Sequence, residues 1–354
     1  MERSIQSLIE RWDGLGIVCR FDPVSGTWIF ICLHDNTLGA CTGGTRMAVY
    51  PSPADGLRDA MRLAEGMTCK WAAIHERVGG GKAVLAINRP LAGEDRRQLL
   101  LRYGSLVDSL NGAFRTGEDL GTTSSDMQII AEECQFVHGF HPVDGSKVDP
   151  SPFTARAVFE GIKSAASAVF GSDDLAGRTV LIQGVGSVGA SLGRYLAEAG
   201  AVLQLSDIDA ERTEEMARHL EATVLAPEKV YAAECDIYAP CAIGATLNEE
   251  TIPELRCRVV AGSANNQLAE PADAQRLLER GIVYVPDYII NAGGALSFAL
   301  MDRGHSDETV LFEEMASIGS TVQEILQEAA AQNESPVAAA ERRVQKTLTR
   351  ARES

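Results

Sequence analysis

Two lysines stand among small and apolar neighbours, which is unusual for lysines on a protein surface. Lys70 ends the run Met-Thr-Cys-Lys, and Lys82 follows three consecutive glycines. A lysine that is buried beside a second cation loses its proton more easily, so it can act as a base near neutral pH. The alternative is that both side chains run along the surface with their ammonium groups in water. A phosphate-binding P-loop is excluded, because Ala83 follows the second lysine and Glu76 stands where that motif needs glycine.

Two adjacent carboxylates, Glu118 and Asp119, lie in a turn flanked by glycines. Taken alone, such carboxylates are typical of turns and helix caps. The histidines do not indicate a metal site: His75-Glu76 is not followed by a second histidine at position 79, and the six histidines show no metal-ligand spacing. We therefore predict that the protein holds no metal ion.

A glycine-rich segment follows an expected strand and opens an expected helix; its residues are Gly184, Val185, Gly186, Ser187, Val188 and Gly189. In this context a GxGxxG motif indicates dinucleotide binding, because its glycines allow a tight turn, a close approach to pyrophosphate and close packing of helix on strand. The alternative is a glycine turn that binds nothing. Asp207 ends the next expected strand and could bind both ribose hydroxyls while repelling a 2′-phosphate, which favours NAD over NADP. Asp209 is the alternative ribose ligand.

The elements that position these residues fall into two parts, as the length of 354 residues suggests. The loop-forming run at 149–152 marks the boundary between them. In the first part, apolar runs and helical spacing predict strands at 28–33 and 83–87 and helices at about 54–70 and 98–110. In the second part they predict helices at 154–170 and 188–199 and strands at 180–183, 202–205, 237–239, 259–261 and 283–285.

The alternation of strands and helices after the boundary predicts a parallel sheet with helices on both faces. We therefore predict an α/β protein with an N-terminal α/β catalytic domain at 1–150 and a C-terminal doubly wound, Rossmann-type domain at 151–334. A tail helix at about 335–350 is expected to complete the first domain, and the active site is expected in the cleft between the two domains.

The net charge excludes some partners. Lys and Arg number 32 against 49 Asp and Glu, a formal charge of -17, which argues against binding nucleic acid or an anionic membrane. The eight cysteines include no CxxC pair, the first residues lack the apolar core of a secretory signal, and no apolar run reaches membrane-spanning length. We therefore expect a cytoplasmic protein.

Several motifs together resemble the amino-acid dehydrogenases of the glutamate, leucine, phenylalanine and valine dehydrogenase superfamily. The likeness spans nearly the whole chain, and the length suits the short leucine/phenylalanine branch. The motifs that carry it lie at residues 38–47, 66–70, 79–82, 117–123, 183–189, 235–242, 261–268 and 286–294.

The resemblance implies a reaction and a role for each matching residue. Hydride passes from the substrate Cα to nicotinamide, and the resulting imine is hydrolysed to a 2-oxo acid and ammonia. By this likeness Lys82 is the base and Asp119 its proton-transfer partner, while Lys70 clamps the substrate carboxylate with Met67 and the backbone amides of Gly43 and Gly44. The positions implied for NAD, beyond the glycine motif and Asp207, are Thr154, Ala239, Pro240, Cys241 and Asn265.

The implied side-chain pocket consists of Thr42, Gly117, Ala295 and Phe298. Glutamate dehydrogenases place a lysine where Thr42 stands, which argues against glutamate as the substrate. We therefore predict NAD-dependent oxidative deamination of an apolar L-amino acid, either branched or aromatic. Two alternatives remain: the same chemistry on glutamate or an unusual amino acid, and an inactive NAD-binding homologue. The resemblance also implies a homo-oligomer.

Arg115 lies two residues before Gly117 and would share its face in an extended chain. We interpret it as a surface or subunit-contact residue. The alternative is that it reaches a polar substrate tail.

Overall fold

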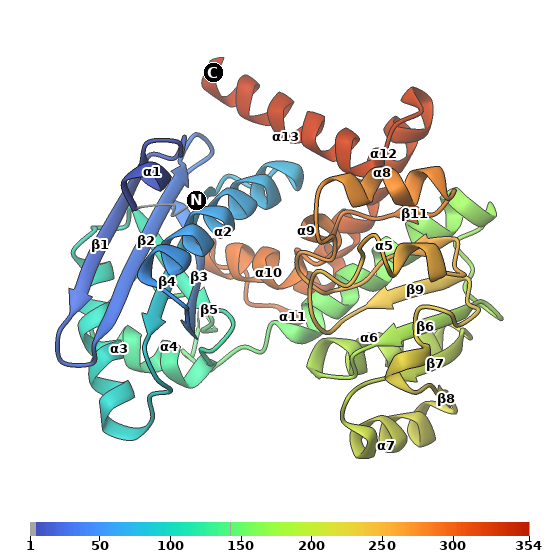
Figure 1. Ribbon diagram of the computed structural model, residues 1–354, viewed down its shortest axis with the longest axis horizontal. Helices are drawn as coiled ribbons and strands as arrows, with labels where there is room; N and C mark the ends of the chain where they lie inside the picture. Colours follow the sequence, from blue (N-terminus) through green and yellow to red (C-terminus); the bar gives the residue numbers. More distant parts are fainter. Residues whose placement is uncertain (1–4, 142, 354) are drawn as a thin grey trace. The chain divides into compact units, whose positions relative to one another are not determined.

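The computed structural model describes residues 5–141 and 143–353, and the chain divides into two units (Figure 1). Unit 1 runs as far as Asp149 and includes the end of the chain from Val344, whereas unit 2 comprises Pro150–Arg343. Each unit has its own β-sheet, and none of the helices in the described ranges is long and apolar enough to cross a membrane.

The sheet of unit 1 has five strands in the order β1-β2-β4-β3-β5. Strand β2 runs antiparallel to both β1 and β4, whereas β3 runs parallel to both β4 and β5. The strands are β1 Gly16–Asp22, β2 Thr27–Asp35, β3 Cys41–Val49, β4 Gly79–Ile87 and β5 Phe114–Glu118.

Helices cover both faces of this sheet. Apolar residues of α2, among them Leu57 and Met61, pack against Phe30 and Val84 on one face, so the predicted helix in this region is confirmed. Residues of α3 and α4 form the core on the other face with side chains such as Leu85. The helices of unit 1 are α1 Ile5–Ile9, α2 Pro53–Ala73, α3 Gly93–Asp108 and α4 Ser124–Ala131.

The run of three glycines before Lys82 differs from the sequence prediction, which began the strand at Ala83. The structure begins β4 at Gly79, so Lys82 lies in the middle of a buried strand. The reason is close packing: a Cβ atom on Gly80 would lie 2.0 Å from the hydroxyl oxygen of Thr68 on α2. Glycine at this position therefore lets the helix approach the strand, and the strand begins earlier than the apolar run alone predicts.

The sheet of unit 2 has six parallel strands in the order β11-β10-β9-β6-β7-β8. This is the predicted Rossmann-type arrangement, in which the strand order reverses beside β6. The strands are β6 Thr179–Gln183, β7 Val202–Ser206, β8 Thr223–Val224, β9 Ile237–Pro240, β10 Val259–Val260 and β11 Val283–Tyr284.

The helices of unit 2 follow and flank these strands. The first, α5, begins at Ser151, three residues before its predicted start, because Pro152 fits the first turn of a helix. The others are α6 Ser187–Glu198, α7 Ala210–Leu220, α8 Ala272–Glu279, α9 Asp287–Ile290, α10 Gly293–Asp302, α11 Glu308–Glu314 and α12 Ala316–Gln332, with short 3₁₀ turns η1 Pro227–Lys229 and η2 Ile252–Glu254. The last helix, α13 Pro336–Glu353, begins in unit 2 and continues into unit 1 from Val344.

Candidate active site

Three neighbouring strands of unit 1 place Lys82 in a row with two glycines. The pairs Thr42↔Gly80 and Thr45↔Ala83 fix the register of β3 on β4, so Gly44 lies opposite Lys82. Gly117 of β5 is in turn paired with Gly44. A Cβ atom on Gly44 would lie 2.9 Å from Cβ of Asp119, so this glycine lets Asp119 approach the row, whereas a Cβ atom on Gly117 would meet only His138 among the described residues, at 3.6 Å.

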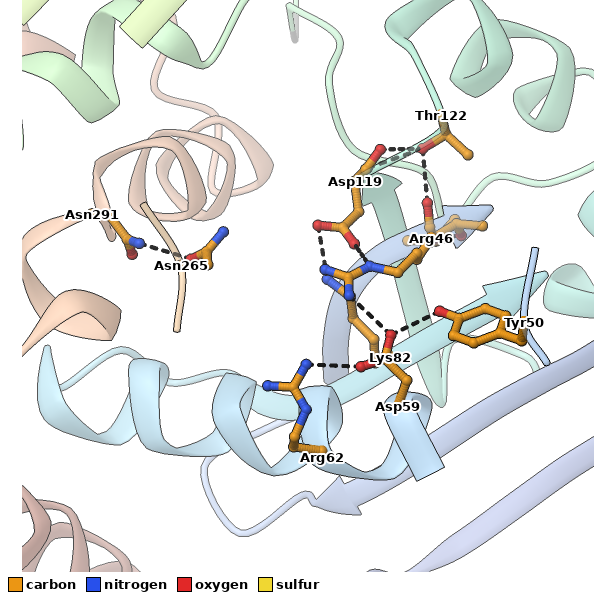
Figure 2. A network of polar contacts seen from close by, with 11 residues as sticks. Arg46, Tyr50, Asp59, Arg62, Lys82, Asp119, Thr122, Asn265 and Asn291 are labelled. Atoms are coloured by element: carbon orange, nitrogen blue, oxygen red, sulfur yellow. Dashed lines mark hydrogen bonds and ion pairs between the residues drawn. The ribbon is translucent and has the colours of Figure 1, made fainter. Parts of the chain in front are cut away.

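Lys82 and Asp119 form a buried ion pair at this row. The Lys82 ammonium nitrogen lies 3.3 Å from Oδ1 of Asp119, and their side chains are only 7% and 17% exposed (Figure 2). Asp119 follows β5 directly, and its backbone N–H donates to the hydroxyl of Thr122, which donates to the carbonyl of Thr45. Asp119, which the sequence analysis places in a turn, is thus held in position as the partner of Lys82 on β4.

A second cation shares Asp119 with Lys82. Arg46 donates through Nε to Oδ2 of Asp119 and through Nη1 to Oδ2 of Asp59, each at 2.9 Å. Asp59, on α2, also accepts hydrogen bonds from Tyr50 and Arg62, as Figure 2 shows. Sequence reasoning missed this network because its members are far apart along the chain.

The charges around Asp119 decide its ionisation. Burial alone would raise the pKa of this carboxyl, but the charges of Lys82 and Arg46 and their hydrogen bonds outweigh burial and lower the pKa. Glu118, next in the chain, behaves in the opposite way: burial raises its pKa, and the charges of Asp149 and Asp126 add to the effect. Asp119 is therefore held as an anion, which sets it apart from its neighbour.

The helix α2 places two further predicted residues on this side of the sheet. The Met67 side chain reaches Gly43, where a Cβ atom would lie 3.3 Å from its Cγ. Lys70 lies half-buried one turn further along α2, within its last turn. Trp71, next to it, donates through Nε1 to the carbonyl of Thr42 at 3.4 Å. Met67 and Lys70 thus lie on the helix that packs over the strand of Gly43.

Beyond β5 lie two residues that sequence reasoning did not assign to the site. The segment after α4 pairs with β5, and a Cβ atom on Gly117 would lie 3.6 Å from Cβ of His138. His138 is buried and so ends the row that begins at Lys82. In the adjacent row, the guanidinium of Arg115 lies over the ring of Phe136, 5.8 Å from its centre. Only the pairing of this segment with β5, which its sequence does not signal, brings His138 and Phe136 there.

In unit 2, the glycine motif forms the turn between β6 and α6. Gly184 has φ +100°, a conformation that favours glycine, and a Cβ on Gly189 would lie 1.9 Å from the carbonyl oxygen of Gly184. The space around Gly186, the residue that precedes α6, holds nothing within 4 Å of a Cβ position. A pyrophosphate fits this arrangement, because it can approach the backbone at Gly186 and meet the N–H groups that begin the helix, those of Ser187, Val188 and Gly189.

Asp207 stands at the end of β7 beside this turn. Its Oδ2 accepts the N–H of Val185 at 2.8 Å, and its Oδ1 accepts the N–H of Asp209 and a guanidinium N–H of Arg212, both at 3.0 Å. Burial would raise the pKa of Asp207, but these hydrogen bonds and the charge of Arg212 lower it. The carboxylate of Asp209 instead caps α7 by accepting the N–H of Arg212. Asp207 is therefore held beside the glycine turn, whereas Asp209 caps a helix.

The remaining predicted residues of unit 2 lie in and after the other strands and on two helices. Ala239 and Pro240 end β9, and Cys241 follows them. Asn265 accepts a hydrogen bond from Asn291 at 2.7 Å (Figure 2).

Thr154 on α5 accepts the N–H of Gly294 at 3.1 Å, which ties α5 to the start of α10. Ala295 and Phe298, three residues apart, share one side of α10. Ala295 and Phe298 are half-buried.

Comparisons with known proteins give one family for both units. Residues 25–136 match a family described as "Glu/Leu/Phe/Val dehydrogenase, dimerisation domain", and residues 202–353 match "Glutamate/Leucine/Phenylalanine/Valine dehydrogenase". The chain is 43% identical to leucine dehydrogenase of Bacillus cereus over 328 residues, which cover 92% of this chain and 88% of that one. It is 41% identical to phenylalanine dehydrogenase of Lysinibacillus sphaericus, with coverage of 92% and 86%. The crystal structure of L-tryptophan dehydrogenase from Nostoc punctiforme matches 99% of this chain and all of that chain, with a TM-score of 0.84 and 36% identity.

Proposed function

The chain belongs to the glutamate/leucine/phenylalanine/valine dehydrogenase family, and we propose that it catalyses the reversible NAD-dependent oxidative deamination of an apolar L-amino acid to the 2-oxo acid and ammonia. It is an oxidoreductase that acts on the CH–NH₂ group of amino acids. The observation that carries the proposed mechanism is the buried Lys82–Asp119 pair beside the two-glycine row.

The residues of unit 1 supply binding and proton transfer. Lys70 and the backbone amides of Gly43 and Gly44 hold the α-carboxylate of the substrate, with Met67 packed beside them. Lys82 takes a proton from the water that attacks the imino carbon and exchanges protons with the amine side, and Asp119 holds the lysine as its proton-transfer partner. Because Arg46 also pairs with Asp119, the carboxylate keeps a cationic partner when Lys82 gives up its proton.

The residues of unit 2 hold the cofactor. The turn of Gly184 and Gly186 and the N-terminus of α6 bind the pyrophosphate of NAD, and Asp207 binds the ribose. Thr154, Asn265 and the end of β9 contact the nicotinamide half. NAD, when bound, accepts the hydride from the substrate Cα. A carboxylate at position 207 supports NAD over NADP, since it repels a 2′-phosphate.

The residues that the family resemblance implies for the substrate side chain, two in each unit, support an apolar substrate. Thr42, Gly117, Ala295 and Phe298 offer no cation for a second carboxylate, and the relatives named leucine, phenylalanine and tryptophan dehydrogenases favour the same class. Glutamate is not favoured. An inactive homologue is not favoured either, because the Lys82–Asp119 pair is intact and buried. We further propose a homo-oligomer, since residues 25–136 match a domain described as a dimerisation domain.

The test is a substrate screen followed by one variant. Purified protein with NAD and each common L-amino acid is followed by NADH absorbance at alkaline pH, and turnover is expected on branched or aromatic substrates. Lys82→Ala should lose at least about 100-fold in kcat, the low end for a general base, while NAD binding is unchanged. Lys147→Ala, an exposed lysine of the same unit, is the control. If no amino acid is oxidised although NAD binds, the proposed function is wrong; if Lys82→Ala stays active, its assigned role is wrong.

A further inference from the structure

Cys235 and Cys257 lie opposite each other where β9 and β10 begin. The two strands pair as Ile237↔Val259, and an isolated parallel bridge before them pairs Glu234↔Arg256. The register is the same at both places, so it sets the two cysteines, which lie between these pairs, directly across from each other. Both side chains belong to the same apolar cluster of unit 2.

This spacing suits a disulfide. Neighbouring strands of a sheet are about 4.8 Å apart, and the Cα atoms of bridged cysteines are usually about 4.4–6.8 Å apart. The two thiols are also close enough to shift each other's pKa, so their sulfur atoms lie near each other.

A second pair of cysteines on adjacent strands serves as a comparison. Cys19 is paired with Phe30, and Cys32 is paired with Ile17, so Cys19 and Cys32 are diagonal neighbours on β1 and β2. Diagonal neighbours are about 7–8 Å apart, which exceeds the span of a disulfide. The register of the sheets thus distinguishes the Cys235–Cys257 pair from the Cys19–Cys32 pair.

The surroundings make the two thiols chemically different. The neighbouring Cys235 lowers the pKa of Cys257, burial opposes this, and the charge of Arg280 adds to the lowering. The neighbouring Cys257 and burial together raise the pKa of Cys235. The thiolate is the reactive form of cysteine, so the lowered pKa and the charge of Arg280 favour Cys257 as the attacking thiol and Cys235 as the resolving one.

We propose that Cys235 and Cys257 form a reversible intrachain disulfide when the protein meets a peroxide. The Cys257 thiolate attacks the O–O bond of hydrogen peroxide, which gives a sulfenic acid and one water. The Cys235 thiol then attacks that sulfur, the S–S bond forms and a second water leaves. The two thiols give up two electrons and two protons, and the peroxide is reduced to two waters; a thiol reductant reverses the reaction.

The position of the pair predicts the consequence of oxidation. The cysteines precede β9 and β10, whereas the residues proposed to hold NAD lie at the opposite, carboxyl ends of the strands. The disulfide links the two strands without touching that edge. We therefore expect the oxidised protein to keep its cofactor binding and to unfold at a higher temperature, because the cross-link restricts the unfolded chain.

The experiment maps the thiols of the full chain. The protein is treated with hydrogen peroxide, free thiols are alkylated, and peptides are analysed by mass spectrometry without reduction. We expect a cross-linked peptide joining positions 235 and 257, about 2 Da lighter than the two thiol peptides together and absent after dithiothreitol treatment. The melting temperature should rise by several degrees on oxidation, as for a loop closed by a disulfide.

Variants separate this disulfide from other oxidation products. Cys257→Ser and Cys235→Ser should lose the cross-link and the rise in melting temperature, whereas Cys19→Ser should keep both. The proposal is overturned if positions 235 and 257 of the unaltered protein are both alkylated after peroxide treatment, or if Cys19 and Cys32 bridge instead. This mapping requires no variant, so a serine variant that fails to fold does not affect the conclusion.

Discussion

Arg46 offers a sharp test of how the active site holds its carboxylate. The guanidinium bridges Asp119 and Asp59 with two bonds of 2.9 Å, and its side chain is 15% exposed. Replacing it by glutamine keeps a polar side chain of moderate length but removes the charge and the two-ended contact. Asp119 then has Lys82 as its only cationic partner in this network, and Asp59 keeps Tyr50 and Arg62.

The size of the effect follows from the bond that is lost. A hydrogen bond between charged groups contributes about 1.5–3 kcal/mol, and each ~1.4 kcal/mol changes a rate tenfold. If the Arg46–Asp119 bond acts on the reaction, Arg46→Gln should lower kcat/KM by about 10- to 100-fold. The pKa of Asp119 should also rise, because one of the two charges that oppose the effect of burial is gone. The acid limb of the kcat/KM profile should therefore move to higher pH.

The assay compares Arg46→Gln with a matched variant of unit 1. Arg102→Gln removes a similar pair, in which Arg102 contacts both oxygens of Asp22 at 2.8 Å, but it leaves the Lys82 network intact. Both variants should lose stability in urea, whereas only Arg46→Gln should lose kcat/KM and shift the pH profile; NAD binding should be unchanged in both. The reasoning is refuted if Arg46→Gln matches the unaltered enzyme in kcat/KM and pH profile, or if Arg102→Gln loses activity equally.

Three further predictions concern cofactor choice, substrate choice and acid stability. Asp207→Ser should raise the NADP-to-NAD ratio of kcat/KM by at least about tenfold, since Arg212 then has a 2′-phosphate as its partner; an unchanged ratio would contradict this. Gly117→Val should fold, because a Cβ atom at this position lies 3.6 Å from Cβ of His138, which is an ordinary contact. The variant should lower the phenylalanine-to-leucine ratio of kcat/KM by about tenfold. Equal losses on both substrates would show that Gly117 does not shape the pocket. The free energy of unfolding should decrease as the pH is lowered below about 4. The reason is that the neighbouring cations lower the pKa of Asp119 against the effect of burial, so this carboxylate stabilises the fold only while it is ionised. Urea titrations from pH 3 to 7 measure the decrease, which should be shallower in Asp119→Asn.

The second unit could be predicted from sequence more fully than the first. Its strands are short apolar runs separated by helices at regular spacing, and the glycine motif marks its first turn, so local signals agree with the parallel sheet. In unit 1 the local signals conflict with the fold. The predicted strand begins after the three glycines that start at Gly79, yet close packing, such as that of Gly80 on Thr68, makes them the start of a buried strand. The need for glycine at these positions comes from residues elsewhere in the sequence that pack against them, so it produces no periodic pattern in the local sequence.

The candidate site shows the same limit. Lys82 could be singled out because a lysine is unusual among small and apolar neighbours, whereas Asp119 received its role only because the motifs resemble a known family. Arg46 lies in one of those motifs, yet nothing in its neighbourhood shows that it joins Asp59, 13 residues away, to Asp119, 73 residues away. His138 has an even weaker signal, since only the pairing of its segment with β5 brings it beside Gly117. Such contacts depend on register, and register is set by the whole sheet.

The order of charges in the network explains how an acidic protein builds a site for an anionic substrate. Arg62, Asp59, Arg46, Asp119 and Lys82 form a chain in which each carboxylate lies between two cations. Three cations and two anions leave one positive charge, in a protein whose formal charge is -17. The excess favours a substrate carboxylate nearby, and the alternation means that no carboxylate is left buried without a partner when Lys82 is deprotonated. Without Arg46, Asp119 would have no cationic partner in this network once Lys82 is deprotonated. The activity, and not only the stability, should therefore depend on Arg46.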